Sequence, residues 1–348
     1  MKLIMEQWRI FLSEGGNVFA GKTDSIPREW IQPTLTKYYE EMGRLFPEHA
    51  NIFNTFTPVG SVGKKERSGD IDLAVDIHAM FENGEVDADA LESWNIVPVN
   101  WSATYDKIKK RARSITDNQI GWRAFLIELV TYINDNSDSL YADPKKIRPE
   151  SMFSLFPQFN ELGEEQDVGV QIDWMLGNTD WLEFSHFSDV PLENEQYLKG
   201  LHRTQLLLSL FLIKGHSFKH KEGIFDKETG RQSARTPEEA LGLLEDLYQV
   251  EIQREDTNNF HSLYSWISDN LSSEDRGATL DSYLKILDYT HGVSIPDSNG
   301  DVKKCGYIPT ILEDYWIANR ENLGLKGRYI CRDTNEKLWN VIHDDTTI

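Results

Sequence analysis

One stretch constrains this chain more than any other: residues 58–76, which read PVGSVGKKERSGDIDLAVD. Its second half alternates acidic or small side chains with apolar ones. Because side chains on a strand point to opposite faces in turn, Asp70, Asp72 and Ala74 are predicted to share one face. The apolar set on the other face is Ile71, Leu73 and Val75. We therefore expect a strand with one face in a core and the other presenting two carboxylates.

Two neighbouring carboxylates on one face repel each other unless a positive charge lies between them. A divalent cation suits them, because hard oxygen ligands favour Mg²⁺, and the phosphates of a nucleotide can complete its coordination shell. Upstream, Gly60 permits a tight turn, and Ser61 offers a hydroxyl and a backbone N–H to a phosphate, especially if a helix begins there. Lys64 adds positive charge. The segment thus predicts a metal site and an anion site side by side.

A third aspartate lies about a hundred residues later, in the stretch VGVQIDWM of residues 168–175. Val168, Val170 and Ile172 alternate there with Gly169, Gln171 and Asp173. This pattern predicts a second strand with an apolar core face. Asp173 is expected on its polar face.

Together, Gly60-Ser61, Asp70-Ile71-Asp72 and Asp173 resemble the active-site motif of the DNA polymerase beta-like nucleotidyltransferase superfamily. The resemblance implies an α+β catalytic domain with a mixed sheet, which transfers a nucleoside monophosphate from an NTP such as ATP to a hydroxyl. It also implies two Mg²⁺ ions, with Mn²⁺ as a substitute, bridged by Asp70 and Asp72, while Asp173 binds one of them and accepts the proton of the acceptor.

In this resemblance Gly60 and Ser61 hold the terminal phosphates of the nucleotide, and Lys64 offsets their charge. Members with a helical second domain often extend a lysine from that domain toward the triphosphate. Lys214 is our candidate, with Lys199 and Arg203 as further cations. A lysine at the end of a helix that offsets the macrodipole explains Lys214 equally well.

The acceptor is the least determined part of the prediction. The formal net charge of −21 argues against a broad nucleic-acid surface, since phosphate neutralisation dominates such binding. One local segment is basic nevertheless, and its cations are Lys107, Lys109, Lys110, Arg111 and Arg113. This segment is either a solvated helix face or a platform for an anion such as RNA, helped by Lys145, Lys146 and Arg148.

An RNA 3′ end such as that of tRNA is therefore favoured slightly over each single alternative. The alternatives are a small molecule, a nucleotide that is extended to an oligonucleotide second messenger, and a protein hydroxyl. A different class is a nucleotide-binding regulatory protein that no longer turns over, and another is a calcium-stabilised structural domain. The Asp pair lacks the longer ligand run of an EF-hand.

The sequence lacks the motifs of several other enzyme classes. The sequence contains neither a P-loop nor a Gly-x-Ser-x-Gly elbow, and its histidines lack the spacing of a zinc helix. Cys305 and Cys331 have no metal spacing and predict reduced thiols. The first residues do not resemble a secretory signal, and no run of eighteen apolar residues occurs. We therefore expect a cytoplasmic protein without a membrane partner.

At 348 residues the chain can form two domains. We expect a catalytic domain over residues 1–190, including N-terminal helices, and a mostly helical domain over residues 191–348 that closes the nucleotide cleft. In the first part we expect helices at 1–14, 25–46 and 119–132, strands at 52–59 and 168–175, a loop at 141–155, and a helix or strand at 181–187. In the second part we expect a hairpin at 218–232 and helices at 197–213, 237–249, 259–271, 274–289, 311–323 and 336–343.

Overall fold

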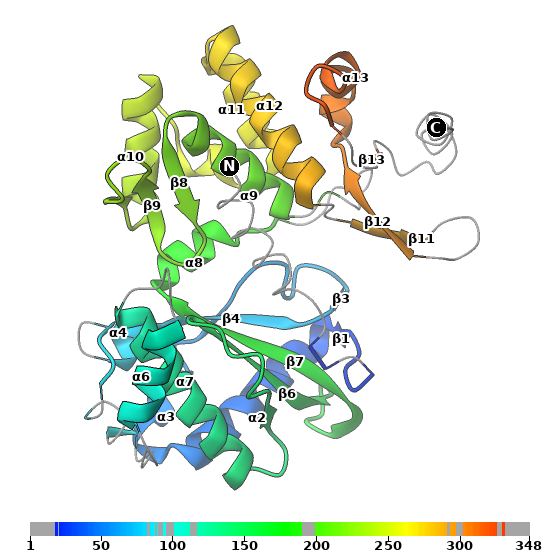
Figure 1. Cartoon of the computed structure of the whole chain (residues 1–348). Coiled ribbons are helices and arrows are strands. Elements are labelled where there is room, and N and C mark those ends of the chain that lie inside the picture. The colour runs from blue at the N-terminus through cyan, green and yellow to red at the C-terminus, as the bar shows by residue number, and fades with distance from the viewer. Residues whose placement is uncertain are drawn as a thin grey trace. The chain divides into compact units, whose positions relative to one another are not determined.

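The computed structural model divides the chain into two compact units (Figure 1). The sheet unit comprises residues 17–185 and 220–222, and the helical unit comprises residues 1–16, 186–219 and 223–348. The structure describes residues 18–19, 21–81, 84–87, 89, 93–94, 101–111, 117–189, 198, 200–290, 293–296, 302–325 and 329–330. The helices predicted at 1–14 and 336–343 lie outside these residues.

The sheet unit is built on a mixed five-stranded sheet with the order β2-β4-β7-β6-β5. Its strands are β2 (Thr57–Pro58), β4 (Ile71–Asp76), β5 (Tyr141–Ala142), β6 (Ser151–Phe159) and β7 (Glu165–Gly177). Strands β4 and β7 run parallel, and all other neighbours in the sheet are antiparallel. A two-stranded ribbon of β1 (Ile26–Pro27) and β3 (Arg67–Ser68) precedes β4. The expected α+β class with a mixed sheet is confirmed.

Helices α2 (Arg28–Leu45) and α7 (Asp117–Asn136) pack on one face of this sheet (Figure 1). The main core lies between them and the strands, because the alternate apolar residues of β4 and β7 point there. From the strands it takes Ile71, Leu73, Val75, Val170, Ile172, Trp174 and Leu176. Within it, the buried Trp174 indole donates a hydrogen bond of 2.7 Å to the Tyr38 hydroxyl. The alternation predicted for both aspartate strands is therefore confirmed, except at Val168, which was expected on the core face and is 41% exposed.

The opposite face of the sheet is only partly covered. There α8 (Thr179–Ser185) packs on β4 and β7, and a small apolar cluster of Val59, Ala74, Met175 and Leu182 forms. The polar residues of the same face, Gln171 and Asp173, are not part of this cluster and hydrogen-bond to each other. The acidic side chains are thus held on a rigid sheet by a core on its far side.

Two predictions of local structure in this unit are wrong. Residues 52–59 are not one strand: α3 (Ala50–Phe53) ends there, and only β2 pairs with β4. Phe53 and Phe56 are three apart and both buried, a helical spacing that we assigned to a strand. The loop predicted at 141–155 contains β5 and the start of β6. Side chains on both faces of β6 are buried there, so the sequence shows no alternation.

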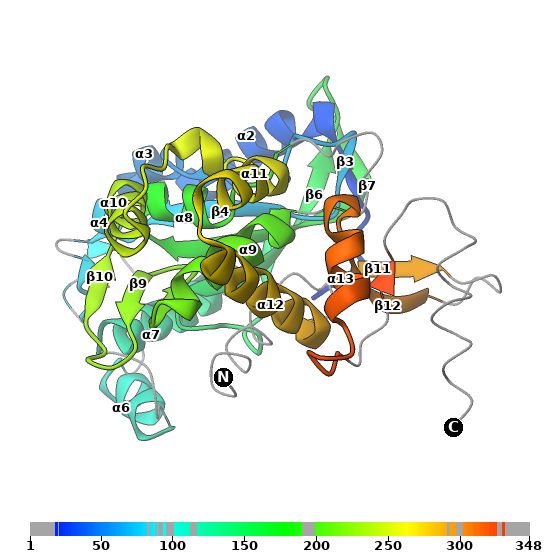
Figure 2. The same cartoon turned by 90° about the horizontal axis from the view of Figure 1, so that it is seen from above.

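The helical unit is organised around α9 (Gly200–Ile213), whose residues 202–211 are all buried. Helices α11 (Phe260–Asn270) and α12 (Ser273–Thr290) pack against it, and α12 lies beside α9 in Figure 2. Further helices are α10 (Pro237–Tyr248) and α13 (Glu313–Asn319). The predicted helices at 197–213, 237–249, 259–271, 274–289 and 311–323 are confirmed within a few residues, although α9 begins later and α13 is shorter.

The predicted hairpin at 218–232 is part of a three-stranded sheet, β10-β9-β8, formed by β8 (His216–Lys219), β9 (Gly223–Asp226) and β10 (Gln232–Ala234). A second small sheet contains β11 (Val293–Pro296), β12 (Val302–Tyr307) and β13 (Tyr329–Ile330). Short helices α4 (Ile77–Met80) and α6 (Trp101–Arg111) belong to the sheet unit, and 3₁₀ turns occur at Pro47–His49, Arg254–Thr257 and Thr310–Leu312. Among the described residues, no helix is both long and apolar enough to cross a membrane.

Candidate metal centre

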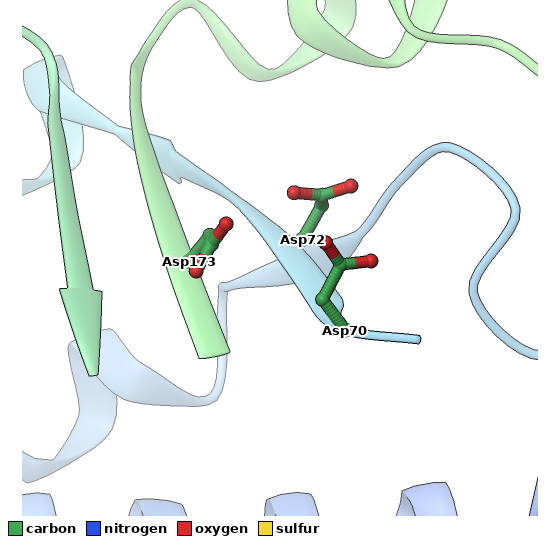
Figure 3. Close-up of side chains that lie close together, drawn as sticks. All are labelled: Asp70, Asp72 and Asp173. Carbon is green, nitrogen blue, oxygen red and sulfur yellow. The ribbon is translucent and has the colours of Figure 1, made fainter. Parts of the chain in front are cut away.

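The two aspartate strands lie side by side in the sheet, and their register brings the acids together. Strand β4 pairs in parallel with β7 so that Asp72 is opposite Asp173. Asp70 immediately precedes β4. One carboxylate oxygen from each of these three residues lies within 4.8 Å of the others. Figure 3 shows the three side chains converging on one side of the two strands.

Asp173 is the buried member of this triad, with 3% of its surface exposed, whereas Asp70 and Asp72 are half-buried. Its Oδ2 atom accepts a hydrogen bond of 2.9 Å from Gln171 Nε2. The Gln171 amide is oriented in turn by the Val18 N–H, which donates to Gln171 Oε1 at 2.8 Å. The other oxygen, Asp173 Oδ1, is buried and has no hydrogen-bond partner among the described residues.

The charge of Asp173 is disfavoured in this position. Burial raises the pKa of its carboxyl well above the ordinary value, and the negative charges of Asp72 and Asp70 raise the pKa further. The Gln171 hydrogen bond and the positive charge of Lys221 act in the opposite direction and are the smaller effects. Burial and the other two carboxylates of the triad thus disfavour the ionised form of Asp173 more than its hydrogen bond and Lys221 favour it.

A divalent cation fits this donor set. Two ionised carboxylates about 5 Å apart repel by ~3 kcal/mol at an effective dielectric constant near 20, and a cation between them reverses the sign of the interaction. Three carboxylates supply the hard oxygen ligands that Mg²⁺ or Mn²⁺ prefers. The Oδ1 atom of Asp173 provides a ligand atom that no donor of the described residues uses. Asp70, Asp72 and Asp173 are therefore the residues that could hold a metal.

The other acid of β4, Asp76, has a different role. Asp76 ends the strand, and its Oδ1 accepts a hydrogen bond of 2.8 Å from the backbone N–H of His78 at the start of α4. It is an N-cap, a common use of aspartate. The triad is thus distinguished from the remaining carboxylate on the same strand.

The Gly-Ser turn follows the β2 residues that pair with the Asp72 strand. The Val59 N–H donates to the Asp72 carbonyl oxygen at 2.9 Å, so the chain leaves the sheet beside Asp72. Gly60 follows with φ of 69°, a conformation that favours glycine. Residues 60–64 form turns, and the helix considered at Ser61 does not begin there. Lys64 lies in the same turn, and its N–H donates to the Ser61 carbonyl oxygen at 3.2 Å.

Lys221 is a cation of this site that the sequence did not reveal. It lies in the segment 220–222, between β8 and β9, which belongs to the sheet unit. Lys221 Nζ donates to Ser151 Oγ. Ser151 begins β6 opposite Met175, two residues beyond Asp173 on β7. The sequence offered no signal, because Lys221 is separated from Asp173 by 48 positions and lies in a turn that we assigned to the second domain.

Three contacts hold the segment 220–222 in place. The His220 carbonyl oxygen accepts a hydrogen bond of 2.6 Å from Ser185 Oγ, and Glu222 Oε1 accepts one of 2.9 Å from Gln119 Nε2. Gly177 permits the close approach of Lys221, since a Cβ at that position would come within 2.9 Å of the Lys221 carbonyl oxygen. The position of the Lys221 charge is therefore determined by the fold.

Lys214 lies in the helical unit, where local contacts account for its position. Its ammonium is 2.7 Å from Asp275 Oδ1 and 4.7 Å from the ring centroid of Tyr248. Arg203 is fully buried in the same unit, where its Nε donates to the Thr257 carbonyl oxygen at 2.5 Å. Burial lowers the pKa of Arg203 to about 9. Lys199 lies outside the described residues. A role for Lys214 at the triphosphate stays a prediction.

The basic segment forms the end of α6. Its cations Lys107, Lys109, Lys110 and Arg111 are exposed, as the reading of a solvated helix face requires, and Lys109 lies 5.7 Å from the ring centroid of Tyr105. Arg113 lies outside the described residues. Exposure is also what an anion platform would need, so both readings stay open.

Comparison with known proteins adds no family to this picture: neither a family model nor a curated protein matches the chain. The site must therefore be interpreted from its own geometry and chemistry.

Proposed function

We propose that this protein is a metal-dependent nucleotidyltransferase. The observation that carries the proposal is the convergence of Asp70, Asp72 and Asp173 within 4.8 Å on two parallel strands. Three like charges at this distance, with a buried unsatisfied oxygen at one of them, are unfavourable unless a cation binds. The resemblance of Gly60-Ser61 and the Asp-x-Asp strand to polymerase beta-like enzymes supports the same conclusion.

In the proposed reaction the oxygen of an acceptor hydroxyl attacks the α-phosphorus of an NTP. The bond from that phosphorus to the β-phosphate oxygen breaks, and pyrophosphate leaves. Asp70 and Asp72 would hold two Mg²⁺ ions, and Asp173 would bind one of them and take the proton of the hydroxyl. Bound magnesium supplies charge neutralisation at the phosphates and lowers the pKa of the attacking hydroxyl.

The remaining residues position the nucleotide. Gly60 and Ser61 would hold the terminal phosphates, and Lys64 would offset their negative charge. Lys221 would keep the pKa of Asp173 from rising further. As in other phosphoryl transfers, the protein contributes chiefly positioning and electrostatic stabilisation.

Incubation with each α-labelled NTP, with and without total RNA, tests the proposal. We expect label to enter a product only with Mg²⁺ or Mn²⁺, and pyrophosphate to appear in equal amount. Labelled RNA would identify a polynucleotide acceptor, and a labelled small product would identify a nucleotide or small-molecule acceptor. If NTP and Mg²⁺ bind but no pyrophosphate forms with any acceptor, the regulatory alternative replaces the enzyme.

Replacing Lys221 by methionine is expected to shift the pH dependence of transfer. The Lys221 charge lowers the pKa of Asp173, so its loss raises that pKa, and a higher pH is then needed to ionise the metal ligand. The acidic limb of the rate profile should move to higher pH, with activity recovering at alkaline pH. The matched control is Lys37→Met, a half-buried lysine on α2 that pairs with Glu40, which should leave the profile unchanged. An unshifted profile in K221M would contradict this role.

A further inference from the structure

A second group of charged residues in the sheet unit is not used by the proposed chemistry. We call Arg111, Arg123 and Arg148 the arginine cluster. Arg111 ends α6, Arg123 lies in α7, and Arg148 lies in the loop between β5 and β6. Gln119, one helical turn before Arg123, donates a hydrogen bond of 2.6 Å to Glu150 Oε1, two residues after Arg148. This bond ties the α7 end of the cluster to the loop end.

The three positive charges act on one another. Burial lowers the pKa of Arg123, and the charges of Arg148 and Arg111 lower it further, while Glu150 opposes them. Glu150 already accepts the Gln119 hydrogen bond. Glu222 accepts from the same Gln119 amide at 2.9 Å, so the carboxylates beside the three cations are shared with a neutral donor.

Two guanidinium groups of the cluster are incompletely bonded. The Nε atoms of Arg123 and Arg148 are buried, and neither has a hydrogen-bond partner in the part of the chain that the structure describes. A buried charged donor without an acceptor is unfavourable. Guanidinium groups match the geometry of phosphate oxygens, which accept two parallel hydrogen bonds from one arginine. The cluster thus lacks an anion, and a phosphate suits its donors.

The loop that carries Arg148 is bonded to the sheet beside the strand of Asp173. The Arg148 N–H donates to the Ser151 carbonyl oxygen at 2.9 Å, and Ser151 also receives the Lys221 hydrogen bond. On the sheet, Ser151 is opposite Met175, two residues from Asp173. The cluster and the triad are therefore connected through the backbones of β6 and β7.

Additional cations extend the cluster beyond the size of one phosphate. Lys107 and Arg111 are exposed and four residues apart on α6, so they share a face about 6 Å apart along the axis. Lys145 and Lys146, in the loop before Arg148, are exposed as well. A row of cations favours a chain of phosphates over a single nucleotide. In a protein with a net charge of −21, this row is a local exception.

We propose that the arginine cluster binds backbone phosphates of a single-stranded RNA, which is the acceptor of nucleotidyl transfer. That the RNA is the acceptor rests on the proposed function, whereas the binding of RNA by the cluster does not. Arg123 and Arg148 contact backbone phosphates, and Arg111 with Lys107 continues the path along α6.

Fluorescence anisotropy of a labelled single-stranded oligoribonucleotide tests the binding in EDTA, where the metal centre does not contribute. We expect the double variant R123Q/R148Q to bind roughly tenfold more weakly than the wild type. The slope of log K against log salt should fall by about 1.4, since each lost phosphate contact contributes about 0.7 for single strands. R111Q, at an exposed site where folding is not at risk, should weaken binding and reduce the slope by about half as much.

The control variant K37Q/R44Q removes the same number of positive charges from α2, a helix that carries no member of the arginine cluster, and should change neither quantity. Equal losses in control and cluster variants, or unchanged binding in both R111Q and R123Q/R148Q, would overturn the proposal. Loss of ATP binding without loss of RNA binding would reassign the cluster to the donor nucleotide. RNA binding that persists in D72N, together with absent transfer by the wild type, would refute the enzyme but keep the RNA site.

Discussion

Asp72→Asn is expected to lower the rate of nucleotidyl transfer by at least ~10³-fold, a loss of about 4 kcal/mol of transition-state stabilisation. Asp72 is opposite Asp173 in the sheet and is the residue that would bridge both metal ions. Asparagine keeps the size of the side chain but removes its charge. The measurement is release of pyrophosphate or incorporation of label from an α-labelled NTP under saturating Mg²⁺. Circular dichroism and thermal unfolding should show an intact fold, because Asp72 is half-buried on the open face.

Asp76→Asn is the matched control for this experiment. It removes the same charge from the same strand, yet Asp76 caps α4 and lies outside the triad. Asparagine is an equally good N-cap, so D76N should transfer at nearly the wild-type rate. Transfer by D72N at a rate equal to that of D76N would remove the proposed mechanism.

Asp173→Asn is expected to stabilise the metal-free protein by about 1–3 kcal/mol at neutral pH. Burial and the two neighbouring carboxylates disfavour the ionised form of Asp173, and asparagine removes that charge while its oxygen can still accept from Gln171. Adding Mg²⁺ should raise the unfolding temperature of the wild type and have little effect on D173N. Thermal unfolding in EDTA and in Mg²⁺ measures both effects.

The pH dependence of this difference has a defined sign. The pKa of Asp173 is higher in the folded protein than the ~3.9 of an unfolded aspartate. Above pH 4 the folded state therefore retains a proton that the unfolded state has lost, and the stability contributed by that proton falls as pH rises through the folded pKa. The advantage of D173N should be absent near pH 3 and grow with pH to a plateau. A D173N protein less stable than the wild type in EDTA at pH 7 would contradict the unfavourable charge.

The sequence predicted the elements that depend on short-range patterns. Alternation in β4 and β7 identified the core face and the acidic face of each strand, and the apolar periodicity identified the helices around α9. Strand β6 was missed because it is buried on both faces, and its pairing with β7 shifts register between Pro157 and Phe159. Alternation of apolar and polar residues identifies a strand with one buried face, so it does not identify a strand such as β6 that is buried on both faces.

The site was predicted to the level of its acids but not of its surroundings. That Asp72 lies opposite Asp173 depends on the register of two strands a hundred residues apart, which packing sets and local sequence does not. Gln171 was visible only as a residue on the polar face. Tertiary structure alone brings Lys221 to the sheet and brings Arg148 and Arg111 near Arg123.

The chain passes from the sheet unit to the helical unit after residue 185, returns for residues 220–222, and leaves again. A fragment that stops at residue 190 would contain all three aspartates but not the ammonium group beside them. We expect Asp173 in such a truncated protein, even if it folds, to have a higher pKa than in the full chain, because the Lys221 charge that lowers this pKa is missing. A chimeric protein that joins the sheet unit to a different second domain would therefore also need residues 220–222.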